Sequence, residues 1–358
     1  MLTPNLRITF LSPPPNLSGG ERVIALYARE LKRLGHTVEI VCYLPKRMPI
    51  LSRLKSLIRG KPFFEWHFRK KSHYRNYRIP FRIARRAGVI LDSDVEDGDI
   101  VIATFWMTAH WAHNLCKSKG RPMYLVQGDE GNLLGKQAEK TYELPMKHIY
   151  VSHWLADKIR GRHPESSGVV IPNAIDEDFI SRATRSCPNK FRLGTMWGGI
   201  GNKASNLAIA AVKQVRDSGL EVELVAFGST RPDPEFKVQI DQFRFCPSQE
   251  EVRQLYSSCN AWLFTSISEG FGLPVLEAMG LGTPVIGTDT GAAAELIPRG
   301  GGWLVPIGDE EMIINAIVEC YRLSSSAWEL RSQKARETAM LWTWPDAASR
   351  LNEVFFSE

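Results

Sequence analysis

Two acids, Glu269 and Glu277, stand eight positions apart around a bend that contains Gly270 and Gly272. The run AWLFTS before the bend has the apolar character of a buried strand, and the residues from Pro274 onward have that of a helix. Free amides at a helix start, together with the helix dipole, bind phosphate or another anionic oxygen. The glycines let a ligand approach the backbone closely. The segment therefore predicts an anion site between a strand and a helix.

The two acids of this segment suit different parts of one ligand. Glu277 falls about one turn into the helix, where a carboxylate can accept two hydroxyl hydrogen bonds at once, as from a ribose diol. Glu269 precedes the helix and can face whatever is attached to the phosphates. A plain strand-turn-helix connection with two surface acids is the alternative interpretation. Glu277 counts against it, because this acid lies among the apolar residues of VLEAMG and a half-buried carboxylate needs partners.

The elements that must position these acids alternate between strands and helices. LRITFLS reads as a strand, NLSGGERVIALYARELKRLG as a helix and HTVEIVCYL as a second strand, which is a βαβ unit with a parallel sheet. The alternation dissolves in the polar stretch 176–189 and restarts with FRLGTMW. Two consecutive doubly wound α/β units are predicted, with ligands at the carboxyl ends of the strands.

The predicted domain boundaries follow from this interruption. Residues 1–182 form the first Rossmann-like domain, which carries a basic insert over 46–86, and residues 183–338 form the second. At ~150 residues per domain, two domains agree with the length of 358. Residues 339–358 contain an amphipathic segment beyond the second sheet, predicted to be a helix that crosses back to the first domain.

Composition excludes several classes of protein. The 44% of hydrophobic residues argues against disorder, and no run approaches ~18 apolar residues. Six scattered cysteines argue against a disulfide framework and a zinc site, and favour a cytoplasmic location. Asp92-Ser93-Asp94 lies in an acidic loop and reads as a solvated turn, so no metal site is predicted.

The positive charge is concentrated in residues 46–86, which hold 14 Lys or Arg and one acid, or +13, while the remainder carries −7. Aromatic residues such as Phe63 and Trp66 stand beside these cations. The combination suits peripheral contact with an anionic membrane surface, or an acceptor on a lipid pyrophosphate or an anionic glycan. An apolar helix face packed on the first domain, with its cations in solvent, is an equal alternative. Nucleic acid ranks last, because no binding motif accompanies the segment.

The run EGFGLPVLEAMGLGTPVIGTDTGAAAELI resembles the retaining GT-B glycosyltransferases of family 4. The likeness extends to SGGERVIALYARELKRLGHTVEIV, IPNAID and FRFCPSQEEVRQLYSSCNAWLFTS. It implies a GT-B fold, in which two Rossmann-like domains face a central cleft. It also implies transfer with retention of configuration from a nucleotide diphosphate sugar (UDP-, GDP- or dTDP-linked), with no metal and no other cofactor.

The resemblance also implies roles for individual residues. Glu269 and Lys203 would be catalytic, with Lys203 neutralising the leaving diphosphate, and Glu277 would bind the ribose. The remaining donor-binding residues that it implies are Gly19 and Gly20 at the phosphates, Phe245 and Pro247 at the base, and Gly270, Phe271, Gly272 and Leu273 at the sugar and diphosphate.

Three departures from the family pattern concern the donor and the acceptor side. An arginine of the family, five positions before the lysine, falls on Gly198. Its histidine falls near Thr104 or Phe105. Where many members have a further histidine, this chain has Gln127-Gly128-Asp129-Glu130, a pattern closer to a rhamnosyltransferase branch that uses a thymidine diphosphate donor. Gln127 and Asp129 are expected on the acceptor side.

The sequence thus predicts transfer of a hexosyl or deoxyhexosyl unit to a glycan or lipid-linked acceptor in surface polysaccharide synthesis. One alternative is a GT-B sugar-nucleotide epimerase, which would act on a single ligand. Another is a non-catalytic subunit that binds a sugar nucleotide or glycan, and the glycine at position 198 gives it some weight.

Overall fold

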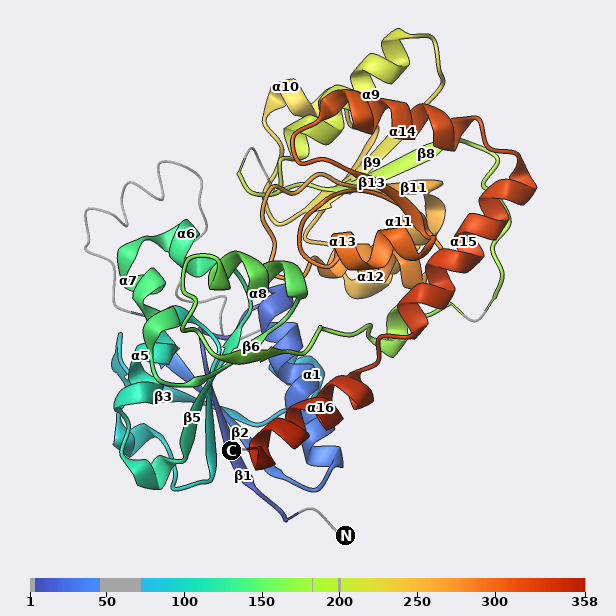
Figure 1. Ribbon diagram of the computed structural model, residues 1–358. Coiled ribbons are helices and arrows are strands. Elements are labelled where there is room, and N and C mark those ends of the chain that lie inside the picture. Colours follow the sequence, from blue (N-terminus) through green and yellow to red (C-terminus); the bar gives the residue numbers. More distant parts are fainter. Residues whose placement is uncertain (1–3, 46–71, 182, 199–200, 358) are drawn as a thin grey trace. The chain divides into compact units, whose positions relative to one another are not determined.

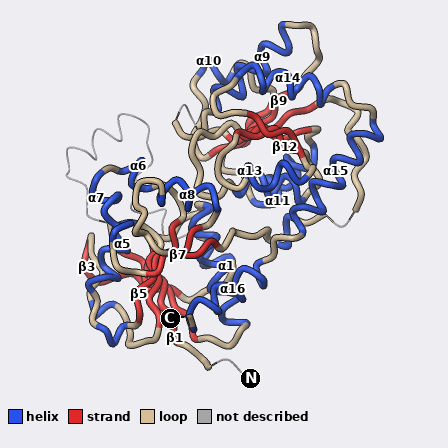
Figure 2. The backbone as a smooth tube through the Cα atoms, in the orientation of Figure 1, coloured by secondary structure: helices blue, strands red, loops and turns tan. Residues whose placement is uncertain are grey.

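The computed structural model describes residues 4–45, 72–181, 183–198 and 201–357, which form two compact units (Figure 1). The first unit comprises Met1–Val151, Ala156–Ile171 and Trp344–Glu358, and the second comprises Ser152–Leu155 and Pro172–Thr343. The chain therefore enters the second unit earlier, and leaves it later, than the predicted boundaries after residues 182 and 338. In each unit a parallel sheet forms the centre and helices surround it (Figure 2).

The first unit is built on a seven-stranded parallel sheet in the order β3-β2-β1-β4-β5-β6-β7. Its strands are short apolar runs, and the central ones are buried along their whole length, as expected where helices cover both faces of a sheet. In chain order they are β1 (Arg7–Ser12), β2 (Thr37–Leu44), β3 (Phe81–Ala87), β4 (Ile100–Ala103), β5 (Arg121–Val126), β6 (Lys147–Tyr150) and β7 (Gly168–Val170).

The helices of the first unit follow the strands as crossovers. α1 begins with a serine N-cap, and its apolar face from Val23 to Leu31 is buried. The helices are α1 (Gly19–Arg33), α4 (His73–Asn76), α5 (Trp106–Asn114), α6 (Glu130–Leu134), α7 (Lys136–Glu139), α8 (His153–Arg160) and α16 (Trp344–Phe356). Three short 3₁₀ turns accompany them, η1 (Asp92–Asp94), η2 (Lys117–Lys119) and η3 (Lys140–Glu143).

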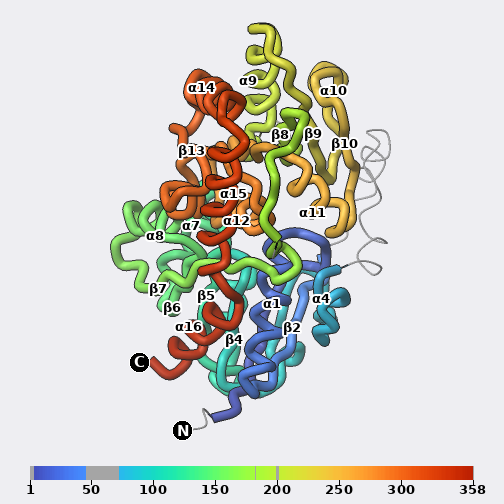
Figure 3. The backbone as a smooth tube through the Cα atoms, turned by 90° about the vertical axis from the view of Figure 1, so that its right-hand side faces the viewer, coloured from blue at the N-terminus to red at the C-terminus, as the bar shows by residue number. Residues whose placement is uncertain are grey.

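The last helix, α16, packs against α1, which confirms the prediction that the C-terminal segment returns to the first domain (Figure 3). The ring of Trp344 meets the ring of Tyr27 edge-on at 5.1 Å between centroids. The His36 ring nitrogen Nε2 and the Asn352 side-chain oxygen lie 2.8 Å apart. The final residues of the chain thereby complete the core of the unit in which the chain begins.

The second unit has a six-stranded sheet in the order β10-β9-β8-β11-β12-β13, with the strands parallel. One hydrophobic cluster joins the sheet to the helices that pack on it. Its buried members include Leu224, Leu263 and Trp328. The strands are β8 (Arg192–Met196), β9 (Glu223–Gly228), β10 (Gln242–Phe245), β11 (Ala261–Phe264), β12 (Val285–Thr288) and β13 (Gly302–Val305). The helices are α9 (Ser205–Asp217), α10 (Pro234–Lys237), α11 (Gln249–Ser258), α12 (Leu273–Gly280), α13 (Ala293–Leu296), α14 (Glu310–Tyr321) and α15 (Ser325–Met340), with 3₁₀ turns η4 (Glu177–Phe179) and η5 (Ile297–Arg299).

Each sheet has one place where the strand order reverses direction. In the first unit the reversal lies between β1 and β4, and in the second between β8 and β11. Loops that leave the carboxyl ends of such a strand pair diverge to opposite faces of the sheet and leave a crevice in which α/β proteins bind ligands. The glycines of α1 follow β1, Lys203 follows β8 and Glu269 follows β11, so the topology places all three motifs at these crevices.

Candidate functional site

The loops after β8 and β11 meet beyond the sheet of the second unit. The amide of Ile267 donates to the carbonyl of Asn202 at 2.8 Å, and the Thr265 hydroxyl donates to the carbonyl of Ala204 at 2.9 Å. These bonds hold the chain before α9 against the chain before α12. Lys203 and Glu269, 66 positions apart in the sequence, are thereby brought together.

The ammonium of Lys203 forms an ion pair with Oε1 of Glu269. Ser266 donates its hydroxyl to the same carboxylate oxygen at 2.7 Å, and the Glu269 amide donates to the Thr290 hydroxyl at 3.2 Å. The Lys203 side chain is 30% exposed and that of Glu269 is 13% exposed. The acid is therefore oriented from three directions, while its cationic partner stays in contact with solvent and accessible to an anionic ligand.

The bend before α12 is held in place through its backbone carbonyls. The carbonyl of Gly270 accepts from the Ser152 hydroxyl at 2.6 Å, and that of Phe271 accepts from the Ala292 amide at 2.6 Å. Gly272, the N-cap, has φ +89°, and a Cβ there would come within 2.8 Å of the Phe264 ring. Within the part of the chain that the structure describes, the amides at 270–273 donate no hydrogen bond. Backbone amides without a partner at a helix start are suited to binding an anion, which is what the sequence predicts for this segment.

Glu277 is buried one turn into α12, at 6% exposure. The Tyr256 hydroxyl of α11 donates to its Oε2 at 3.0 Å. The Tyr256 ring itself is packed on Trp262, 4.4 Å between centroids. The half-buried carboxylate predicted from the apolar surroundings in VLEAMG thus has a rigid aromatic donor as a partner, which fixes the direction in which it points.

Phe245 is the last residue of β10, at the edge of the second sheet, and Pro247 follows two positions later. The Phe245 side chain is 48% exposed, and the guanidinium carbon of Arg231 lies 4.8 Å from its ring centroid. Cys246, between them, takes φ +47°, a left-handed conformation that turns the chain after the strand. An exposed aromatic ring at the carboxyl end of a strand is a surface on which a nucleobase can stack.

Gly198 occupies the position at which the family pattern has an arginine. A Cβ on Gly198 would lie 2.4 Å from Cγ and 2.7 Å from Cβ of Lys203. These are atoms near the backbone of Lys203, so the collision could not be relieved by moving the ammonium alone. The Lys203 side chain therefore occupies the space that a side chain at position 198 would need, and it reaches Glu269 through that space.

In the first unit, the start of α1 brings Gly20 against Gln127. A Cβ on Gly20 would come within 3.4 Å of the Gln127 side-chain oxygen. The Gln127 amide nitrogen lies 3.4 Å from the carbonyl of Thr104, the residue after β4. Thr104 is buried and donates its hydroxyl to the Leu11 carbonyl of β1 at 2.8 Å. The predicted residues Gly19, Gly20 and Gln127 therefore share the crevice of the first sheet.

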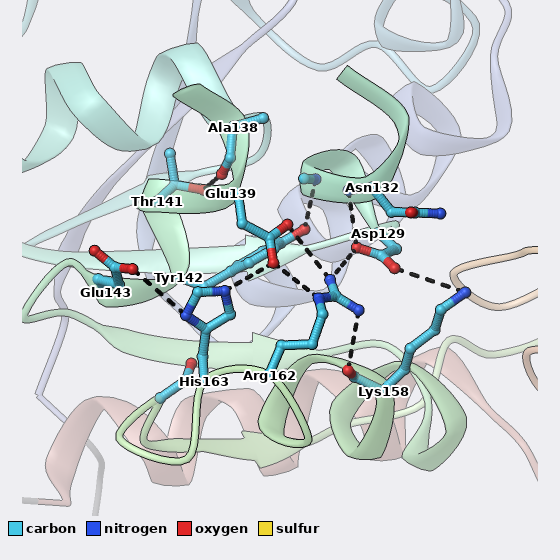
Figure 4. A network of polar contacts seen from close by, with 12 residues as sticks. Asp129, Asn132, Ala138, Glu139, Thr141, Tyr142, Glu143, Lys158, Arg162 and His163 are labelled. Carbon is cyan, nitrogen blue, oxygen red and sulfur yellow. Dashed lines mark hydrogen bonds and ion pairs between the residues drawn. The ribbon is translucent and has the colours of Figure 1, made fainter. Parts of the chain in front are cut away.

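Asp129 lies in a network of charged side chains inside the first unit (Figure 4). Its carboxylate is 0% exposed, accepts from the Arg162 guanidinium at 2.6 Å and lies 3.6 Å from the Lys158 ammonium. Arg162 also binds Glu139, and His163 lies 2.8 Å from the same carboxylate. Burial acts to raise the pKa of Glu139, but Arg162 and His163 outweigh it and hold that pKa below its usual value. This geometry favours a structural role for Asp129 over the predicted contact with an acceptor.

Glu130, next in the chain, is also buried. It accepts from the Trp106 amide at 2.6 Å and from the Tyr124 hydroxyl at 3.0 Å. Burial raises the pKa of Glu130 to about 7, although these two hydrogen bonds act in the opposite direction. Glu130 therefore joins the first turn of α6 to the first residue of α5 and to β5.

Most of the basic segment, residues 46–71, lies outside the described residues. The part that is described, 72–86, forms α4 and the edge strand β3. In the described ranges, no helix is long and apolar enough to cross a membrane.

The described residues contain no group of three or more His, Cys, Asp or Glu side chains that could hold a metal ion. The acidic turn 92–94 is solvated only in part. Asp94 is 4% exposed and accepts from the amides of Arg85 and Leu91 at 3.0 Å each, whereas Asp92 binds the amide of Cys116. The prediction of a solvated turn was wrong for Asp94, because its buried carboxylate accepts backbone hydrogen bonds that stabilise the turn.

Sequence reasoning missed the residues that orient the site. Ser266, Thr290 and Tyr256 contact Glu269 or Glu277 but belong to none of the motifs. Ser266 offered a signal, because a hydroxyl placed directly after a buried strand lies at the ligand edge of a parallel sheet. Thr290 and Tyr256 reach the site only through tertiary packing.

Both halves of the chain match known family models. Residues 17–179 match the model described as Glycosyltransferase Family 4, and residues 191–322 match the model described as Glycosyl transferases group 1. The two matched ranges contain Gly19, Gly20 and Gln127 in the first case and Lys203, Glu269 and Glu277 in the second.

Curated relatives match over part of their length. The O-antigen chain mannosyltransferase RfbU of Salmonella typhimurium is 35% identical over 89 residues, which is 25% of this chain and 25% of the relative. The phosphatidyl-myo-inositol mannosyltransferase of Mycobacterium leprae is 26% identical over 204 residues, 53% of this chain and 54% of the relative. The matched regions thus span about half or less of these relatives.

The fold is shared over nearly the whole chain with a solved structure of HepE from Anabaena in complex with UDP-glucose. The TM-score is 0.74 at 15% identity, with 98% of this chain and 99% of the other covered. This likeness confirms the predicted arrangement of two Rossmann-like domains. Together with the two family matches, it places the chain in the GT-B glycosyltransferase superfamily that comprises group 1 and family 4.

Proposed function

We propose that the protein is a retaining glycosyltransferase that takes a hexosyl or deoxyhexosyl unit from a nucleotide diphosphate sugar. The observation that carries the proposal is the pairing of Lys203 with Glu269 at the reversal of the second sheet, beside the open amides of residues 270–273. A cation, a carboxylate and a row of amide donors at one crevice suit a ligand that has both a diphosphate and a sugar.

The donor would lie along the carboxyl edge of the second unit. The diphosphate would accept hydrogen bonds from the amides of Gly270, Phe271, Gly272 and Leu273. Glu277, held by Tyr256, would accept from the ribose hydroxyls, and the base would stack near Phe245 and Pro247. Donor complexes of the related fold support this assignment, since the HepE structure contains UDP-glucose.

Charge stabilisation would be the main catalytic contribution. Breaking the bond between the anomeric carbon and the diphosphate oxygen leaves negative charge on the diphosphate, and donors aimed at that charge lower the barrier. Lys203 and the four amides are such donors in this chain. Glu269, oriented by Ser266 and the Thr290 contact, would face the transferred sugar. We propose that these groups suffice without a metal ion, so turnover should persist in EDTA.

We further propose that the acceptor is a glycan or a lipid-linked precursor of a surface polysaccharide, bound on the side of the first unit where Gln127 lies. Names of curated relatives support this class of product, since RfbU is an O-antigen chain mannosyltransferase. Gly19 and Gly20 would come against the donor phosphates. The structure gives Asp129 internal ion pairs, so we leave it out of the proposed acceptor site.

A thermal-shift panel of UDP-, GDP- and dTDP-sugars tests the donor class. A specific donor should raise the unfolding temperature of the wild type, because a ligand that binds only the native state stabilises it. The dTDP-rhamnose member tests the resemblance to a rhamnosyltransferase branch. No shift with any of the three nucleotide classes would contradict the proposal.

The stereochemical course needs a separate experiment with the donor that binds. The anomeric proton signal of the first product in NMR should show the configuration of the donor sugar. Inversion would contradict the retaining mechanism, but it would still agree with a glycosyltransferase that inverts the configuration.

Contact with an anionic membrane surface through residues 46–86 is a further part of the proposal, based on the charge of +13 in that segment. The full chain should sediment with anionic liposomes, and Lys or Arg to Glu changes at 53, 55, 59 and 69–71 should release it. Equal sedimentation of the charge-reversed chain, or none of the parent, would contradict membrane contact.

A further inference from the structure

The carboxylate of Glu21 is buried beside the two glycines of α1 and joins three segments of the first unit. The side chain is 4% exposed in total. Its Oε2 accepts from the amide of Asn16 at 2.5 Å, in the loop after β1, and its Oε1 lies 3.5 Å from the amide of Tyr74 in α4. Ser72 and His73 also hydrogen-bond to it.

The contact with Asn16 departs from what the local sequence predicts. Ser18, two glycines and Glu21 form the pattern of a capping box, in which the glutamate would accept from the amide of the N-cap serine. Ser18 does cap α1, since its hydroxyl accepts from the Glu21 amide at 3.3 Å. The Ser18 amide, however, donates to the side chain of Asn16 at 2.6 Å, and Glu21 reaches two residues further back. Glu21 therefore stabilises the loop after β1 through Asn16 and does not complete a capping box with Ser18.

The segment 72–74 is bound to the same loop by two other contacts. The His73 amide donates to the Asn16 carbonyl at 3.2 Å, and the hydroxyls of Ser12 and Tyr74 lie 2.6 Å apart inside the protein. Because Glu21 accepts from both Asn16 and Tyr74, one carboxylate fixes the loop before the glycines and the first turn of α4 together.

We propose that Glu21 is the positioning residue of the Gly19–Gly20 turn and that it locks this turn to the segment 72–74. The inference rests on the proposed function, which places these glycines at the donor phosphates. Glu21 itself is directed away from the crevice into the unit, toward Asn16 and Tyr74, so it acts through the loop and not on the ligand.

The contacts of Glu21 depend on its ionisation. A carboxylate accepts at both oxygens, whereas the neutral acid must donate a proton at one of them and meets amide donors on each side. Burial raises the pKa of Glu21 to about 7, against the hydrogen bonds that lower it. The titratable groups packed around it are Cys42 of β2 and His73 and Tyr74 of α4; burial raises the pKa of Cys42 and of Tyr74 far above this range, so both stay neutral. Burial outweighs the hydrogen bonds, so the closed form holds the proton more tightly than an open, solvated Glu21 would, and the lock should weaken as the pH rises through 7.

Hydrogen exchange of the full chain tests the lock without any donor. Glu21→Gln removes one acceptor oxygen and presents an amide donor in its place. Amides of residues 13–20 and 72–77 should exchange about tenfold faster in this variant than in the wild type at pH 8. Glu30→Gln is the matched control, because Glu30 is equally buried on α1 but pairs with Arg29 and Arg33, away from the turn. Wild-type exchange in both segments of E21Q would overturn the proposal.

The wild type gives a second measurement that needs no variant. After correction for intrinsic exchange, the same two segments should gain protection between pH 8 and pH 6, and they should gain it together. In E21Q this pH dependence should be absent. If E21Q kept it, another group would be responsible and Glu21 would not be the lock.

Turnover links the lock to the reaction. With the sugar nucleotide that gives a thermal shift, kcat/KM of the wild type should fall as the pH rises above 7, while E21Q should be lowered about tenfold with a flat profile and E30Q should follow the wild type. A normal profile in an active E21Q would overturn the proposal. Absence of turnover in the wild type would instead contradict the proposed function, and the exchange experiment would still decide the role of Glu21.

Discussion

At the scale of single residues, the charged side chains of the site in the second unit each contact a defined partner. Lys203 is bound to Glu269, Glu269 to Ser266, and Glu277 to Tyr256. Preorganised charges of this kind need little rearrangement when a ligand arrives. In the proposed reaction, the donor diphosphate would have to draw the Lys203 ammonium at least partly away from Glu269.

Lys203→Ala should abolish most of the turnover without unfolding the protein. Removing one donor to a developing negative charge lowers kcat by about 10²- to 10³-fold. Lys213→Ala is the matched control, because Lys213 lies on the following helix α9 in an exposed ion pair with Asp217. Steady-state release of nucleoside diphosphate measures the effect, and near-normal kcat in K203A would remove Lys203 from the mechanism.

Gly198→Ala should also impair the site, because its Cβ would lie 2.4 Å from Cγ of Lys203. The lysine would have to leave its present path to Glu269, and kcat/KM should fall by about tenfold. Gly201→Ala serves as the control in the same loop, since a Cβ there meets nothing within 4 Å. Equal kinetics of the two variants would show that the path of Lys203 is not restricted at position 198.

At the scale of elements, buried acids hold loops and helix starts in the first unit. Glu130 joins α6 to α5 and β5, and Asp129 joins the start of α6 to Arg162 after α8. These residues lie in the strand-to-helix connections that border the crevice of the first sheet, so the crevice is held by polar contacts as well as by packing.

Glu130→Gln should change how stability depends on pH. Burial raises the pKa of Glu130 to about 7 from its ordinary value of 4.5, so the folded protein retains a proton that the unfolded chain releases. Its contribution to the free energy of unfolding is therefore fully present below pH 4.5 and declines as pH rises toward 7, by on the order of 3 kcal/mol.

Thermal unfolding of wild type and E130Q between pH 4.5 and 8 measures this effect. The wild type should lose stability relative to E130Q as the pH rises through that window. A constant difference between the two proteins would show that Glu130 keeps an ordinary pKa in the folded state.

At the scale of the whole chain, the alternation of strands and helices was predictable, and the comparisons confirm the GT-B fold. The periodic apolar pattern carries that information locally. Short elements are less predictable: the stretch 136–143 divides into α7 and the 3₁₀ turn η3. There Glu139 faces Arg162 and His163 from later in the chain, and such long-range pairs leave no local pattern.

The parts of the candidate site that follow directly from the sheet topology were predictable from the sequence. Lys203 and Glu269 follow neighbouring strands, so a parallel sheet requires them to be close, and the structure joins them. Asp129 was expected on the acceptor side because it lies in the stretch where many members of the resembled family have a histidine. Its carboxylate turns inward because Arg162 and Lys158 of a later segment supply compensating charge, which the spacing of residues does not reveal.

Trp344→Ala should destabilise the first unit, although residue 344 follows the whole of the second. The indole is 2% exposed and packs on Tyr27, and removing a buried large aromatic side chain costs about 3–5 kcal/mol. Phe356→Ala, at a position 45% exposed on the same helix, should cost far less. Melting temperatures compare the two, and similar losses would contradict the packing of α16 described above.

The return of α16 to α1 has a consequence for the order of events during synthesis. A ribosome releases the glycine turn, the strands of the first sheet and then all of the second unit before it releases Trp344. Until then Tyr27 and His36 lack the partners that α16 supplies, so the first unit is completed only after the second has been translated.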